Sequence, residues 1–370
     1  MPATLTPAQL ARDLAVRDLA DPAAGPHAVQ LVVDRAVGAL ADRWPCAVRR
    51  WPGDRIVTVA DNYDNLGYDP ADVTRDARYT RYVDADHVLR SHSSAMIPAA
   101  LRALAANPAD DVLLVCPGVV YRRDSIDRLH SGTPHQLDLW RITRHPMTPA
   151  DLRDMVAKLV GELLPGRPWR LEPRRHPYTV DGAQLDVEHD GAWVEIAECG
   201  LAHPAVLARA GLGADRSGLA LGMGLDRMLM LLKGIPDIRL LRSSDPAVAA
   251  QLTDLAPYRP VSALPPVRRD LSIAVAADDR AEDLGDRVRD ALGEDADVVE
   301  SVEIRQETLC AELPPQALAR LGARPDQKNL LVRLVLRPIS TTLSDHEANV
   351  LRDRAYVALH RGSVHQWAAD

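Results

Sequence analysis

The stretch LALGMGLDRMLMLLKGIPDIRLL at residues 219–241 decides the fold. It starts as a strand-like run that contains Gly222 and Gly224, and it continues as an apolar helix whose first turn carries Asp226 and Arg227. The helix dipole favours an acid at this end, whereas a cation there is mildly unfavourable and needs another reason. Glycines that let a ligand approach the backbone, followed by a fixed guanidinium, suit a nucleotide phosphate. The stretch alone leaves helix capping and phosphate binding both open.

The composition is that of an ordinary globular chain. It has 370 residues, 46% of them hydrophobic, and a formal charge of -8, which allows two domains with sizeable cores. No apolar run of about 18 residues and no signal-peptide pattern occurs, so the sequence predicts a cytoplasmic protein without a membrane segment. The four cysteines have no metal or disulfide spacing. The negative charge argues against a protein that coats nucleic acid indiscriminately.

Residues 1–255 alternate predicted helices with antiparallel strands, which indicates an α+β core. Helices are predicted at 26–44, in the later part of 86–107 and at 147–164, where Thr148 is the expected N-cap. Strands are predicted at 55–62, 112–124, 135–144, 184–190 and 192–200.

A second domain is expected at residues 256–370. Four prolines between Pro257 and Pro266 predict a stiff linker. Beyond them the order is strand, helix, strand, strand, helix, with room for a last short strand. This order fits the split βαβ or ferredoxin-like motif.

Four motifs follow one another along the chain. They are SHSSAM at 91–96, YRRDSIDRLHSGTPHQLD at 121–138, GMGLDRMLMLLKGIPDIRLL at 222–241, and PVRRDLSIAV at 266–275 with TTLSDHEAN at 341–349. In this order they resemble phenylalanyl-tRNA synthetase, a class II aminoacyl-tRNA synthetase, in its single-chain mitochondrial arrangement. The resemblance implies a class II antiparallel sheet core flanked by helices, and a C-terminal ferredoxin-fold anticodon-binding domain.

The resemblance also implies roles for individual residues. Arg122 and Arg227 align with the motif 2 and motif 3 arginines on the ATP phosphates, and they are the predicted catalytic residues. Attack of a carboxylate on the α-phosphorus builds up negative charge, which guanidiniums and Mg²⁺ can stabilise. ATP and Mg²⁺ are therefore the implied cofactors. The predicted ATP-binding residues are Arg122, Asp124, His130 and Arg227. The predicted amino-acid-binding residues are His92, Ser94, His135, Gln136, Asp138, His176, Tyr178, Glu198 and Ala220.

The amino-acid site departs from the family pattern. Where the family has F-P-F-T-E-P-S, this chain has HPYTVDG, so His176 and Tyr178 replace two phenylalanines that embrace the substrate ring. Glu198 introduces a carboxylate where the family has glycine, and Asp138 is one methylene shorter than the family's glutamate. A buried carboxylate is costly unless it is paired. We therefore expect either a neighbouring arginine or a polar substrate to compensate Glu198.

The sequence contains no phenylalanine, although it contains eight tyrosines. Average usage predicts on the order of a dozen in a chain of this length. We hypothesise that the gene excludes these codons because the protein must be made when charged Phe-tRNA is scarce or mischarged. Drift in a GC-rich genome is the alternative. Either cause would replace phenylalanines at the amino-acid site without any change of substrate.

The implied function is formation of an aminoacyl adenylate from ATP and transfer of the acyl group to tRNA. The expected substrate is phenylalanine or a more polar aromatic or heterocyclic amino acid. Two alternatives stay open: a paralogue that supplies a small molecule or carrier protein without tRNA, and a non-catalytic regulatory paralogue. Residues 258–370 carry 15 basic and 19 acidic side chains, which is unpromising for RNA binding. We expect a monomer or homodimer.

Overall fold

The computed structural model describes residues 4–261, 265–339 and 341–365, which form two compact units. The first unit comprises Met1–Arg122, Thr133–Ile235 and Gln251–Tyr258. The second comprises Arg123–Gly132, Pro236–Ala250 and Arg259–Asp370. Two segments that precede residue 255 thus group with the second unit, and the division at 255/256 stays a prediction. Among the described helices, none has the length and apolar character needed to cross a membrane.

The first unit is built on a seven-stranded sheet with the order β1-β4-β5-β9-β8-β7-β6. Its first two strands are parallel and all other neighbours are antiparallel. The strands are β1 (Ala47–Arg50), β4 (Asp111–Val119), β5 (His135–Thr143), β6 (Trp169–Pro173), β7 (Thr179–His189), β8 (Ala192–Ala202) and β9 (Ser217–Gly224). This sheet confirms the predicted α+β core.

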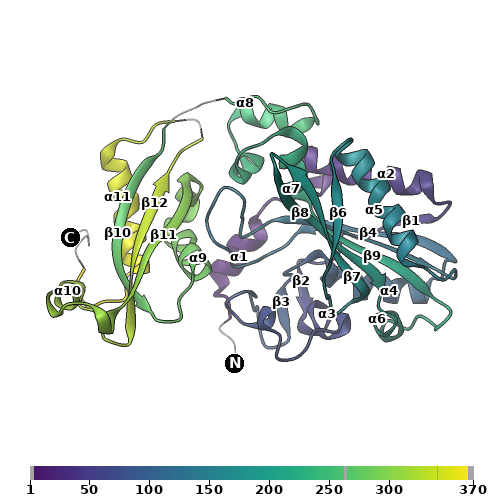
Figure 1. Ribbon diagram of the computed structural model, residues 1–370, viewed down its shortest axis with the longest axis horizontal. Coiled ribbons are helices and arrows are strands. Elements are labelled where there is room, and N and C mark those ends of the chain that lie inside the picture. The colour runs from purple at the N-terminus through teal and green to yellow at the C-terminus, as the bar shows by residue number, and fades with distance from the viewer. Residues whose placement is uncertain (1–3, 262–264, 340, 366–370) are drawn as a thin grey trace. The chain divides into compact units, whose positions relative to one another are not determined.

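Helices cover both faces of this sheet (Figure 1). On one face lie α2 (Ala28–Arg43) and α5 (Pro149–Leu163), and on the other lie α4 (Ile97–Ala106) and α6 (Pro204–Arg209). Leu101, Leu104 and Leu207 of the second pair are buried against Leu114 and Trp140 of the sheet. Each fully buried leucine contributes about 1.5–3 kcal/mol of stability.

Local capping explains where two of these elements begin. The Thr148 side chain accepts a hydrogen bond from the amide of Asp151 and forms a capping box, which confirms the predicted start of α5. The predicted strand at 55–62 is wrong in its second half. Thr58 accepts a hydrogen bond from the Asp61 amide, so β2 (Ile56–Thr58) ends there and α3 (Val59–Asn62) follows. Strand β2 pairs with β3 (His87–Leu89). Helix α1 (Pro7–Ala15) comes before β2, α3 and β3 in the chain.

The opening stretch forms the predicted strand-to-helix turn. Strand β9 ends at Gly224, which is the N-cap of α7 (Leu225–Lys233), and Asp226 lies in the first helical turn. The helix stops at Gly234, whose φ of 68° lies in the left-handed region that favours glycine. Arg227 is therefore held at the start of a helix, as the sequence predicts.

The second unit has a three-stranded antiparallel sheet with the order β10-β12-β11. Its elements are α8 (Pro246–Ala249), β10 (Val267–Ala276), α9 (Ala281–Leu292), β11 (Val299–Leu309), α10 (Pro315–Leu321), β12 (Gln327–Leu336) and α11 (Asp345–Leu359). The long helices bury Leu284 and Tyr356 in one core with Ile273 of the sheet and Ile126 of the earlier segment.

The predicted strand and helix order of this unit is present, with α10 as an addition. No fourth strand occurs in residues 265–339 or 341–365, so the ferredoxin-like assignment stays a prediction. The predicted proline linker includes residues 262–264, which lie outside the described residues.

Candidate functional site

Two arginines emerge at one edge of the first unit's sheet. Gly118 of β4 and Gly224 of β9 lie on either side of Gln136 of β5, so β4 and β9 end at the same edge. Arg122 shortly follows the end of β4, and Arg227 shortly follows the end of β9. The sheet thus places at one edge two arginines that are far apart in the sequence.

Backbone carbonyls hold both guanidinium groups. Arg122 donates from Nε to the carbonyl of Ser91 at 2.8 Å, and Arg227 donates from Nη1 to the carbonyl of Glu195 at 2.9 Å. Both residues are half-buried. Within residues 4–261 neither guanidinium forms an ion pair with a carboxylate. Two fixed cations without acid partners can bind an anion such as a phosphate.

A row of aligned residues crosses the sheet beside this edge. Asp138 of β5 is opposite Gly222 of β9, Gly222 is opposite Glu198 of β8, and Glu198 is opposite Gln184 of β7. Directly opposed residues share one face of a sheet. Because Gly222 has no side chain, none separates the two carboxylates at that position.

Three protein donors bond to the Asp138 carboxylate. Its Oδ2 accepts from the hydroxyls of Ser93 at 2.5 Å and Ser94 at 3.2 Å, and its Oδ1 accepts from Trp140 Nε1 at 3.0 Å. The residue is 1% exposed. Burial raises the pKa of Asp138 to about 6, even though these hydrogen bonds act in the opposite direction. Asp138 therefore holds the segment after β3 against β5, and its predicted contact with the amino acid stays a prediction.

His92 begins the turn that contributes these serines. Both of its ring nitrogens are buried without a hydrogen-bond partner among the described residues. Its ring stacks on that of Tyr68, with 5.7 Å between the ring centroids. It packs in an edge-on arrangement with Tyr63, with 6.2 Å between the ring centroids. Burial, together with the charge of Arg122, lowers the pKa of His92 to about 3. The imidazole is therefore neutral at physiological pH and can donate or accept a hydrogen bond. Next to it, Ser93 donates its amide hydrogen to Gln136 Oε1 at 3.0 Å.

Glu198 lies beside the two residues that replace the family's phenylalanines. Its Oε1 is 3.2 Å from Nε2 of His176, and its Oε2 is 3.5 Å from the hydroxyl of Tyr178. Burial favours a higher pKa for Glu198, but the adjacent His176 and the charges of Arg174 and Arg122 lower the pKa below its usual value. No arginine forms an ion pair with Glu198 in residues 4–261. The expected arginine ion pair is thus absent there, His176 lies within ion-pair distance instead, and the alternative of a polar substrate stays open.

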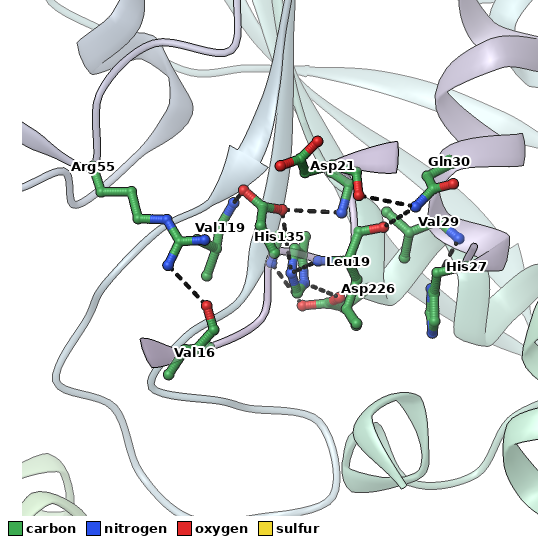
Figure 2. Close-up of polar contacts among 12 residues, drawn as sticks. Val16, Leu19, Asp21, His27, Val29, Gln30, Arg55, Val119, His135 and Asp226 are labelled. Carbon is green, nitrogen blue, oxygen red and sulfur yellow. Dashed lines mark hydrogen bonds and ion pairs between the residues drawn. The ribbon is translucent and has the colours of Figure 1, made fainter. Parts of the chain in front are cut away.

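His135 lies inside the first unit and contacts Asp226 and Leu19 (Figure 2). Its amide donates to Asp226 Oδ2 at 2.8 Å, its Nδ1 is 2.9 Å from Asp226 Oδ1, and its Nε2 accepts from the amide of Leu19 at 3.0 Å. The residue is 1% exposed. His135 therefore ties the start of β5 to the start of α7, which carries Arg227. Its predicted contact with the amino acid stays a prediction.

The remaining predicted residues lie in two different places. Ala220 is buried in β9, opposite Trp140 and Gly200. Asp124 and His130 belong to the segment that groups with the second unit. There Arg289 donates to the carbonyl of Asp124, and His130 Nδ1 is 2.7 Å from Asp127 Oδ2. The predicted ATP contacts of Asp124 and His130 stay predictions.

The sequence reasoning missed three residues of this region, Ser93, Trp140 and Tyr68, whereas it singled out Gly222 as a glycine that lets a ligand approach the backbone. Ser93 lies inside the quoted SHSSAM motif, where its neighbour Ser94 was the predicted residue. Trp140 follows Asp138 by two residues on the same face of β5, a spacing from which its contact could have been found. Tyr68 lies in a loop that has no pattern pointing to this site.

Comparison with known families agrees with this arrangement. Residues 43–252, more than half of the chain, match the family described as tRNA synthetases class II core domain (F). The chain belongs to this family. The matched range contains both edge arginines and the whole row across the sheet. It confirms the predicted class II resemblance.

Individual relatives match over a smaller part. The chain is 36% identical over 194 residues to the phenylalanine-tRNA ligase alpha subunit of Prochlorococcus marinus (strain MIT 9313), covering 52% of this chain and 56% of that one. It is 30% identical over 220 residues to the protein of the same name from Nostoc punctiforme, covering 59% and 64%. The chain thus spans little more than half the length of these relatives. A pyrrolysyl tRNA synthetase from Desulfitobacterium hafniense aligns with a TM-score of 0.44 at 17% identity, over 58% of this chain and 73% of that one.

Proposed function

We propose that this chain activates an amino acid with ATP and transfers the resulting acyl group to tRNA. The observation that carries the proposal is the pair Arg122 and Arg227, held at one sheet edge with no carboxylate partner among residues 4–261. An oxygen of the amino-acid carboxylate attacks the α-phosphorus of ATP, and the bond to pyrophosphate breaks. Guanidiniums fixed beforehand stabilise the negative charge that develops in this transition state.

The family membership and the aromatic side chains support an aromatic amino acid as the substrate. Relatives of this chain are named phenylalanine-tRNA ligase alpha subunits. Tyr178 lies with its ring centroid 6.4 Å from that of Tyr68 and 6.2 Å from that of Trp140. Phenylalanine or a more polar aromatic or heterocyclic analogue is the proposed substrate. Ser94, Gln136 and His92 would orient its amino and carboxylate groups.

Mg²⁺ would arrive bound to ATP. No group of three or more His, Cys, Asp or Glu side chains that could hold a metal occurs in the part of the chain that the structure describes. In nucleotide sites a magnesium ion is usually held by substrate phosphates together with only one or two carboxylates, so it needs no larger ligand cluster from the protein. The ion would add positive charge at the phosphates, and the protein's part is to hold the arginines.

ATP–pyrophosphate exchange with a panel of amino acids tests adenylate formation. We expect exchange that depends on one aromatic or heterocyclic amino acid, followed by charging of tRNA with that amino acid. Absence of exchange with every amino acid, from protein that binds ATP, would refute activation and favour the regulatory alternative.

A second candidate function keeps the adenylate but not the tRNA. In the second unit Arg269 lies 2.7 Å from Asp345, and Arg333 makes two hydrogen bonds of 2.8 Å to Asp270. Carboxylates that neutralise arginines weaken attraction to RNA phosphates. This observation favours transfer of the acyl group to a small molecule or carrier protein. Amino-acid-dependent exchange without charging of any tRNA would identify this function.

A further inference from the structure

The two carboxylates of the row differ in what can reach them. Asp138 is 1% exposed and accepts three hydrogen bonds from protein groups. The Glu198 side chain is 34% exposed, although it projects from the same face of the sheet. A ligand on this face can therefore contact Glu198 without displacing a protein hydrogen bond from Asp138.

The neighbours of Glu198 contact its carboxylate but leave some of its hydrogen-bond acceptor sites open. His176 Nε2 lies 3.2 Å from Oε1, and the His176 side chain is 6% exposed. Neither ring nitrogen of His176 meets hydrogen-bond geometry with any described residue. A buried polar group left unsatisfied costs free energy. A donor on a ligand would give the Glu198 carboxylate a well-aligned hydrogen bond that His176 does not supply.

The surroundings of this carboxylate are aromatic. The rings of His176 and Tyr178 stack, with centroids 5.7 Å apart and an interplanar angle of 22°. Tyr178 in turn lies near Tyr68 and Trp140. Stacked rings favour a further flat ring beside them. Since an ionised carboxylate only accepts hydrogen bonds, the group that meets Glu198 must donate one.

We infer that Glu198 selects an aromatic amino acid whose ring carries an N–H or O–H donor, and that His176 and Tyr178 position its carboxylate. The inference rests on the proposed function, because it names the substrate class of that same site. Phenylalanine leaves Glu198 without a donor. A site built to bond a substrate donor discriminates strongly against the analogue that lacks it.

Amino-acid binding in the absence of ATP tests the inference separately from catalysis. Calorimetric titrations would compare phenylalanine with tyrosine, 4-aminophenylalanine, tryptophan and histidine. We expect the parent to bind at least one donor-bearing amino acid about 100-fold or more tightly than phenylalanine. Glu198→Ala should reduce that preference to within about threefold, chiefly by weakening the donor-bearing ligand. Glu162→Ala, at an exposed position of α5, is the matched control and should keep the preference.

Glu198→Gln keeps the size of the side chain and serves if Glu198→Ala does not fold. Its amide oxygen still accepts a hydrogen bond but lacks the charge, so the preference should fall about tenfold, since hydrogen bonds to charged groups are stronger than neutral ones. Tightest binding of phenylalanine by the parent, or no binding of any of the five, would overturn the inference. Equal weakening of all five by Glu198→Ala would also overturn it, because Glu198 would then bind the common ammonium group. Donor-selective binding without pyrophosphate exchange would instead refute the proposed function alone.

Discussion

Two arginines of the first unit differ from several arginines of the second in their counter-ions. Arg122 and Arg227 of the first unit donate to backbone carbonyls and form no ion pair within residues 4–261. In the second unit a single carboxylate, that of Glu300, accepts hydrogen bonds from Arg128 at 2.7 Å and from Arg337. The first unit thus keeps these two arginines without acid partners, although it pairs others, such as Arg81 with Asp13 at 2.7 Å, and the second unit neutralises several of its own.

The difference indicates where a charged ligand belongs. A half-buried charge without a partner costs free energy. Such a local conflict is expected at functional sites, where a ligand supplies the missing charge. An arginine that already pairs with a carboxylate contributes to stability instead. The same contrast holds for carboxylates, because Asp138 has only neutral donors whereas Glu300 has arginines.

The largest effect is expected for Arg227→Ala. Loss of a donor that stabilises transition-state charge usually costs about 100-fold or more in rate. We expect pyrophosphate exchange to fall by that factor while circular dichroism and thermal unfolding stay those of the parent. Arg43→Ala, which removes a cation from the exposed Arg43–Asp154 pair, is the control and should keep full exchange. Exchange within tenfold of the parent in Arg227→Ala would contradict the assigned role.

Histidine–aspartate pairs extend the comparison to stability. The His135–Asp226 pair in the first unit has side-chain exposures of 0% and 7%, whereas His130–Asp127 in the second has 40% and 39%. His135→Ala removes the imidazole contact with the buried Asp226 carboxylate, although the backbone amide of residue 135 still donates to it, and should lower the free energy of unfolding by about 2–4 kcal/mol. His130→Ala should cost less than about 1 kcal/mol. Urea titrations measure both, and equal losses would show that burial does not govern these pairs.

The Asp138 carboxyl should give stability a distinctive pH dependence. Its pKa is raised from 3.8 to about 6 in the folded protein, so between these values the folded state binds the proton that the unfolded state has released. This contribution to stability is full below about pH 4 and is lost as the pH rises through about 6. Relative to Asp138→Asn, the parent should lose on the order of 3 kcal/mol between pH 4 and 7. Parallel stability curves for the two proteins would contradict the raised pKa.

The smallest effect is expected for Arg333→Ala in the second unit. The Arg333–Asp270 pair is partly exposed, at 31% and 45%, and such exposed pairs contribute little to stability. Exchange should be unchanged, since the arginine is already neutralised. A loss of tRNA charging without loss of exchange would indicate instead that this arginine leaves its carboxylate to bind RNA.

Local signals account for what the sequence predicts correctly. The N-cap Thr148 and the turn from Gly224 to Arg227 depend on neighbouring residues, and both are found as expected. The hydrogen bonding of the Asp138 carboxylate depends on Ser93, which is distant in the chain, and no local pattern encodes that contact. Packing of Ile126 into the second unit's core is likewise a long-range contact. Sequence reasoning therefore predicts local elements, whereas the side-chain contacts between distant segments follow only from the fold.

ATP binding tests the central claim most directly, namely that Arg122 and Arg227 are cations kept for the nucleotide phosphates. Calorimetric titration with ATP in the presence of Mg²⁺ would compare the parent with the Arg122→Ala/Arg227→Ala double variant. Two charge-assisted contacts at about 1.5–3 kcal/mol each predict that the double variant binds ATP at least about 100-fold more weakly than the parent. Equal affinity in the two proteins would contradict the account.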